Sequence, residues 1–112
     1  MRDSRELTFV FLPTYERTAK GVISDDAQRW LEETICADPR TGAVIRGTGG
    51  VRKVRVALPG RGKSGGARVV YYYRSTKGRI YLILAYSKNT KDDLTRSEEA
   101  ALKKLTATLE TE

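Results

Sequence analysis

The sequence predicts one α+β domain in which a small antiparallel β-sheet is covered by N-terminal helices and by a C-terminal helix. The 112 residues have the length of a single domain, residues 1–112. One strand-like run precedes helical segments, three strand-like runs follow, and a helix closes the chain. Because the last strands are joined by short connections, we expect them to pair antiparallel, which together with the separate helices indicates an α+β fold.

The N-terminal part contains the first strand and a short helix. Residues 6–12, "ELTFVFL", are rich in β-branched and aromatic side chains, and they predict a strand that Pro13 ends. Residues 14–21, "TYERTAKG", predict one or two helical turns that stop at Gly21.

Residues 24–39, "SDDAQRWLEETICADP", predict a full helix. Ser24 caps it, acidic residues follow at the positive end of the helix dipole, and Asp38-Pro39 ends it. The apolar residues that recur at helical spacing are Ala27, Trp30, Leu31 and Ile35. We expect Trp30 to anchor the core and Cys36 to lie in it as a small hydrophobic side chain.

Residues 40–50 form a glycine-rich connector, and three strands follow it at residues 51–58, 67–74 and 79–88. In the first of them Val54, Val56 and Leu58 share one face, while Lys53 and Arg55 share the other with Val51 and Ala57. In the second, Arg68, Val70, Tyr72 and Arg74 share one face. The third is almost continuously apolar, which is typical of a central strand, and the Lys77-Gly78 turn makes the last two a hairpin.

Residues 95–110 predict the closing helix. Thr95 and Glu98 have the spacing of a capping box. The expected buried stripe consists of Ala101, Leu102, Leu105 and Leu109.

The charge distribution indicates a polyanionic partner. The net charge is +7, and the window from Arg40 to Lys91 holds thirteen Lys or Arg and no Asp or Glu. The fourteen acidic residues lie outside it, eight before and six after. A stretch of one sign sets up a positive field that suits nucleic acid, although a solvated basic surface is the alternative.

Residue types that are missing or rare exclude several classes of chemistry. The chain has no histidine and one cysteine, so an internal disulfide and Ser-His-Asp or Cys-His catalysis are excluded, and we expect no zinc site and no cofactor. No apolar run is long enough for a signal peptide or a membrane span. We therefore expect a soluble, cytoplasmic protein without a membrane partner.

Residues 57–66, "ALPGRGKSGG", fit a loose phosphate-loop pattern. A working phosphate loop lies between a strand and a helix, whose N-terminus binds the phosphates. Here the following residues, "ARVVYYYR", favour a strand instead. We interpret the stretch as a hairpin tip whose Arg61 and Lys63 can still reach a phosphate backbone.

The strand faces predict a different site, with chemistry that suits RNA cleavage. Antiparallel pairing can bring Lys53, Arg55, Arg68, Tyr86 and Lys88 onto one sheet surface, which we expect to have no carboxylate nearby. The 2′-hydroxyl of RNA can attack its neighbouring phosphate if a base, an acid and positive charge are supplied. Without histidine, lysine must transfer the proton, arginine acts as an electrostatic clamp, and the tyrosine can stack on a base.

The same residues resemble a known family. "GTGGVRKVRVALPGRGKSGGARVVYYYR" followed by "IYLILAYSKNTKDDLT" is similar to the HigB branch of the RelE-like toxins of bacterial type II toxin–antitoxin systems. The likeness covers roughly residues 22–105, and its most specific parts are "GGVRKVRV", "GKSGGARVVYYY" and "YSKNTKDDL". It implies a RelE-like fold and an mRNA endonuclease that cuts codons in the ribosomal decoding site, with a HigA-like helix-turn-helix antitoxin as partner.

By this resemblance, Lys53 and Arg55 match the paired basic residues of the family's second strand, Arg68 the arginine that opens the third, and Lys88 the basic residue after the last. Arg55 stands where RelE has lysine, which leaves proton transfer to Lys53 or Lys88. RelE also has a catalytic C-terminal tyrosine, which the final helix here lacks, and Tyr86 is the candidate substitute. Further RNA contacts are expected from Arg52, Arg61, Lys63, Tyr72, Arg74 and Lys91.

Some alternatives stay open at this stage. Asp92 and Asp93 can either orient Lys88 or begin the last helix. One alternative is a toxin similar to ParE. The ParE toxins share the RelE-like fold and poison DNA gyrase through protein contacts, which do not need a basic sheet face. A third reading is an RNA-binding module that does not cleave.

Overall fold

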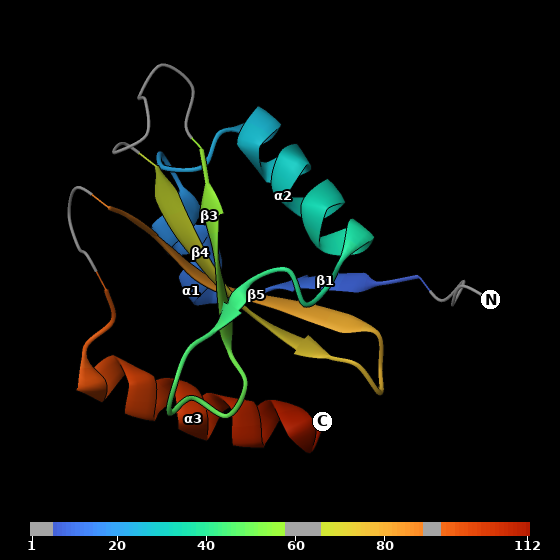
Figure 1. The fold of residues 1–112 in the computed structure, drawn as a ribbon, viewed down its shortest axis with the longest axis vertical. Helices are drawn as coiled ribbons and strands as arrows, with labels where there is room; N and C mark the ends of the chain where they lie inside the picture. Colours follow the sequence, from blue (N-terminus) through green and yellow to red (C-terminus); the bar gives the residue numbers. More distant parts are fainter. Residues whose placement is uncertain (1–5, 58–65, 89–92) are drawn as a thin grey trace.

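The computed structural model describes residues 6–57, 66–88 and 93–112, which form a five-stranded sheet covered on both faces by helices (Figure 1). The strand order is β1-β5-β4-β3-β2. Helices α1 and α2 cover one face of the sheet and α3 covers the other. The predicted α+β class is confirmed. None of the helices in the described residues has both the length and the apolar character needed to cross a membrane.

Strand β1 (Thr8–Phe11) pairs in parallel with β5, from Thr8 opposite Arg79 to Phe11 opposite Leu82. The sheet is therefore mixed, and the expectation of a purely antiparallel sheet is wrong at this edge. Helix α1 (Pro13–Ala19) starts directly after β1, because proline suits the first helical position, where no amide hydrogen is needed. Helix α1 packs on the sheet, where the Thr18 hydroxyl accepts a hydrogen bond from the backbone N–H of Ala85 in β5. The two helices α1 and α2 and the strands β2–β4 separate β1 from β5 in the sequence.

Helix α2 (Asp25–Ala37) lies within the predicted residues 24–39, and Ser24 accepts a hydrogen bond from the backbone N–H of Ala27. Its buried residues are Ala27, Leu31 and Ile35, which are spaced by four. Trp30 is 47% exposed and Cys36 is also exposed, so their expected places in the core are wrong. The buried stripe of α2 is narrow, and both side chains lie beside it rather than in it.

The remaining strands are β2 (Ala43–Val44), β3 (Arg52–Val56), β4 (Ala67–Arg74) and β5 (Arg79–Ser87), all antiparallel to one another where they pair. The two-residue edge strand β2 falls in the glycine-rich connector and was not expected. The β4–β5 hairpin is confirmed, and Gly78 has a φ of +63° in its turn, a conformation that glycine adopts without strain.

The two faces of the sheet belong to two separate cores. Val69 and Tyr71 of β4 pack with α1 and α2, whereas Val70 and Tyr72 of the same strand pack with α3. This alternation assigns every β4 side chain to a face. An irregularity between Val70 and Tyr71 shifts the β4–β5 register by one residue of β5.

Helix α3 (Arg96–Glu110) begins with the predicted capping box, in which the Thr95 hydroxyl and the Glu98 carboxylate each accept the other residue's backbone N–H. Leu102 and Leu109 are buried as expected. Ala101 is exposed, and the buried residue between the leucines is Thr106. The Thr106 hydroxyl donates to the backbone oxygen of Thr48 at 3.1 Å, which joins α3 to the turn before β3.

Candidate functional site

A row of three predicted site residues crosses the sheet on the α3 face. Arg55 of β3 is directly opposite Arg68 of β4, and Arg68 is directly opposite Tyr86 of β5. Lys53 lies two residues before Arg55 on the same strand and therefore on the same face. The register places these four of the five predicted residues on one face, and Lys88 follows the end of β5.

The cations of this group reach solvent. Arg55 is exposed, and Lys53 and Arg68 are partly exposed. Lys88 follows the end of β5, where its backbone N–H donates to Gly66 O at 3.1 Å, and its side chain is also partly exposed. We refer to Lys53, Arg55 and Arg68 together as the cation row.

A carboxylate lies at the cation row, so the expectation that none is nearby is wrong. The Lys53 Nζ atom is 3.4 Å from Asp93 Oδ1. A hydrogen bond from the backbone N–H of Leu94, and then the charges of Lys53 and Arg68, lower the pKa of the Asp93 carboxyl. The two roles left open for Asp93 are to orient Lys88 or to begin the last helix. Its described side-chain contact is with Lys53, and Asp93 stands two residues before Thr95, the N-cap of α3.

Tyr86, the cross-strand neighbour of Arg68, is part of the core under α3 rather than an open aromatic wall. It is 7% exposed, it packs in the α3 core, and its phenolic oxygen has no contact with solvent. Burial, with the Asp93 charge second, raises the pKa of Tyr86, so the phenol is neutral at pH 7. The expected stacking of this ring on a base is therefore corrected, because no ring face is available.

Arg52 lies on the opposite face from Lys53, since the two are adjacent on β3. Its guanidinium Nη1 donates to Arg40 O at 3.0 Å and to Gly42 O at 2.7 Å. The same loop is held by Tyr71, whose hydroxyl accepts from Gly42 N and donates to Pro39 O. Arg52 thus secures the connector after α2 and is not part of the cation row.

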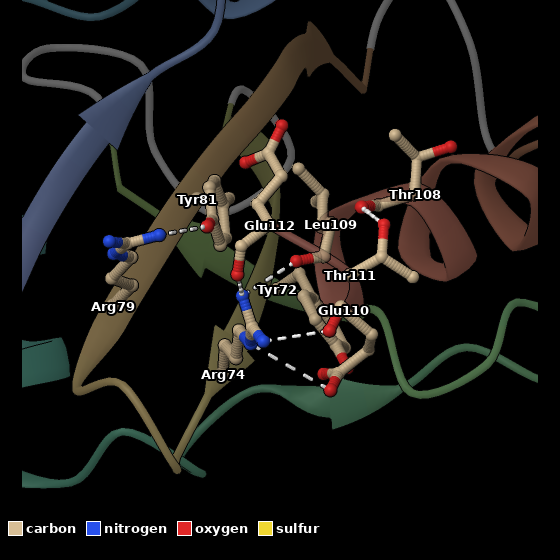
Figure 2. A network of polar contacts seen from close by, with 9 residues as sticks. All are labelled: Tyr72, Arg74, Arg79, Tyr81, Thr108, Leu109, Glu110, Thr111 and Glu112. Atoms are coloured by element: carbon tan, nitrogen blue, oxygen red, sulfur yellow. Dashed lines mark hydrogen bonds and ion pairs between the residues drawn. The ribbon is translucent and has the colours of Figure 1, made fainter.

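Tyr72 and Arg74 are on the predicted face but at its far end, under the last turn of α3 (Figure 2). Arg74 is 8% exposed and donates to the backbone oxygens of Leu109, Glu110 and Glu112. Tyr72 donates to the Glu110 carboxylate. Their expected exposure to RNA is therefore corrected. The guanidinium is held by backbone oxygens at the C-terminal end of α3, where the helix dipole is negative and favours a cation.

The remaining predicted contacts cannot be placed. Arg61, Lys63 and Lys91 lie outside the described residues. The residues on either side of the phosphate-loop pattern are described, and there Val56 of β3 pairs with Ala67 of β4. The strand β4, rather than a helix, therefore follows the phosphate-loop pattern, which removes the context that a phosphate loop requires.

The cation row can bind a phosphodiester through charge-assisted hydrogen bonds, because two guanidinium groups and one ammonium group lie together on one face. No cluster of three or more metal-ligating side chains occurs among residues 6–57, 66–88 and 93–112. The fold and this site together define a small α+β protein with a basic sheet face.

Comparisons with known proteins agree with that class. A family model described as "RelE toxin of RelE / RelB toxin-antitoxin system" matches residues 14–112. The solved structure of a double mutant of the E. coli toxin RelE in the free state is similar with a TM-score of 0.55 and 19% identity, and the match covers 87% of this chain and 96% of that chain. At this identity the structural likeness supports the fold alone.

This chain belongs to the RelE toxin family, since the family model covers nearly all of it. Its members are toxins of toxin–antitoxin systems.

Proposed function

We propose that this protein is a ribosome-dependent mRNA endonuclease of the HigB branch, inhibited by a HigA-like helix-turn-helix antitoxin. The observation that carries the proposal is the cross-strand register of Arg55 and Arg68, with Lys53 two residues away on the same face. Like charges on facing strand positions are unfavourable unless an anion balances them. A phosphate backbone is the anion that the family membership points to.

The reaction that fits these residues is an internal transfer at phosphorus. The 2′-oxygen of one ribose forms a bond to the adjacent phosphorus while the bond from phosphorus to the 5′-oxygen breaks. A base takes the 2′-hydroxyl proton, and an acid gives a proton to the departing 5′-oxygen. Arg55 and Arg68 stabilise the extra negative charge on the phosphorane, and no metal ion enters the scheme.

Lys53 and Lys88 are the two candidates for proton transfer, because arginine stays protonated at neutral pH. Lys53 is anchored beside the arginines on β3, and Lys88 is anchored at the end of β5. Tyr86 is assigned as a positioning residue, because it lies beside Arg68 in the cross-strand register and is buried in the core under α3. Arg61, Lys63 and Lys91 are proposed to contact phosphates next to the cleaved one.

The proposal is tested in a purified translation reaction, by primer extension on the translated mRNA. We expect cuts at fixed codon positions only when ribosomes and the toxin are both present, and none after addition of the cognate antitoxin. Cleavage of naked mRNA at the same rate would contradict ribosome dependence. DNA breaks that require gyrase, with the mRNA intact, would show that the chain acts as a ParE-like toxin instead.

A further inference from the structure

The Asp93 carboxylate is a feature that the proposed reaction does not use. It comes from the segment that leads into α3 and reaches across to β3, where it is 3.4 Å from Lys53 Nζ. The Asp93 side chain is 62% exposed and the Lys53 side chain is 32% exposed. The contact is therefore a surface ion pair, and such pairs are easily broken and sensitive to salt.

The Asp93 carboxylate lies beside the cation row, in contact with Lys53. Its charge interacts with Arg68 as well as with Lys53, and both lower the pKa of Asp93. A carboxylate and a phosphodiester each offer two oxygens that share one negative charge. Lysine and arginine bind both groups with the same donors.

We propose that Asp93 occupies the phosphate subsite of the free protein and is displaced by the scissile phosphate when RNA binds. The proposal rests on the proposed function, in which Lys53 and Arg68 hold that phosphate. Displacement needs little rearrangement, because Asp93 is mostly exposed and its hydrogen bond from the Leu94 N–H is local. Asp93 thus weakens the binding of RNA that merely collides with the free toxin.

The test measures binding of a non-cleavable 2′-O-methyl RNA oligonucleotide by fluorescence anisotropy at low salt. Asp93→Asn removes the charge and keeps an oxygen that can accept from Leu94. The matched control is Glu33→Gln, which changes the net charge equally but lies on the exposed side of α2. We expect Asp93→Asn to bind RNA about two- to five-fold more tightly than the control, with the gain shrinking as salt is added. Asp93→Ser provides a second neutral variant in case the first is unstable.

A double variant locates the effect. In the Lys53→Ala background, Asp93→Asn should gain clearly less affinity than in the wild type, because the shared cation is gone. An equal gain in both backgrounds would show a general charge effect and overturn the proposal. The proposal is also overturned if Lys53→Ala weakens RNA binding while Asp93→Asn and Glu33→Gln bind RNA with the same affinity. If instead Lys53→Ala and Arg68→Ala bind RNA as well as the wild type, the proposed function fails first and this inference fails with it.

Discussion

At the scale of single residues, the strand face on which a side chain lies was predictable, and the surroundings of several side chains were not. Alternation along β3 and β4 places Lys53, Arg55 and Arg68 on one face, and the structure agrees. Trp30 has the right spacing for the core of α2 yet is 47% exposed, because a helix on a small sheet buries only a narrow stripe. Asp93 meets Lys53 across forty positions of sequence, and no local pattern reports such a contact.

The exposure of Trp30 leads to a stability prediction. Trp30→Ala should lower the free energy of unfolding by less than about 1 kcal/mol, since surface substitutions away from special features cost little. The control on the next residue, Leu31→Ala, should cost about 2–5 kcal/mol, because Leu31 is fully buried. Urea denaturation of both variants measures the difference. A loss for Trp30→Ala as large as that for Leu31→Ala would place the indole in the core after all.

At the scale of elements, local signals fixed the ends of the helices better than the partners of the strands. Ser24 and the Thr95–Glu98 box start α2 and α3 where the sequence predicts them. The parallel pairing of β1 with β5 was missed, because the partner lies about seventy residues away and strand composition carries no direction. The same limit applies to α3, whose contacts with Thr48 and Arg74 are distant in sequence.

The docking of α3 predicts a contrast between two glycines of the turn before β3. Gly47 and Gly49 have φ values of +78° and +81°, so alanine is strained at either, by about 1–2 kcal/mol. A Cβ at Gly49 would also lie 2.6 Å from Thr106 Oγ1 of α3, whereas nothing lies within 4 Å at Gly47. Gly49→Ala should therefore be less stable than Gly47→Ala by at least about 1 kcal/mol in denaturant titrations. Equal losses would mean that α3 does not press on this turn.

The hydrogen bonds of Arg74 hold the C-terminal end of α3 against the sheet, which leads to a stability prediction. Arg74→Ala leaves the carbonyls of Leu109, Glu110 and Glu112 without their donor, and we expect a loss of about 3 kcal/mol in unfolding free energy. Arg79, its neighbour on β5, makes a single described side-chain bond, to Tyr81, and serves as the control. Arg79→Ala should cost much less. Hydrogen exchange should show faster opening of α3 in the Arg74 variant only, and unchanged exchange there would contradict the assignment.

At the scale of the whole molecule, the two faces of the sheet differ in the side chains that they present. The face under α1 and α2 is built from apolar packing and from the loop that Arg52 and Tyr71 secure. The α3 face combines a core with the cation row at its end. The charge window from Arg40 to Lys91 predicted a basic surface, but part of it is used internally, as Arg52 and Arg74 demonstrate. Composition counts charges and does not say which ones are free.

The free energy of unfolding should fall in alkali because of two buried tyrosines, one in each core. Burial raises the pKa of Tyr15 and of Tyr72 to about 12, above the usual value of about 10. A raised folded-state pKa contributes stability below pH 10 that is lost as the pH rises towards 12. Urea midpoints should therefore fall across this range, with tyrosine ionisation at 295 nm following unfolding. In Tyr72→Phe the fall should be smaller, and an undiminished fall would exclude Tyr72 as a contributor.

The central claim is that the cation row acts on the phosphate during cleavage, and the single-turnover rate of mRNA cleavage on the ribosome tests it most directly. Arg68→Ala should lower that rate by about 100-fold or more, the typical cost of one lost charge-stabilising donor. Lys77→Ala, in the exposed turn at the other end of the sheet, removes the same charge and should cleave like the wild type. Equal rates for these two variants, both folded, would contradict the account.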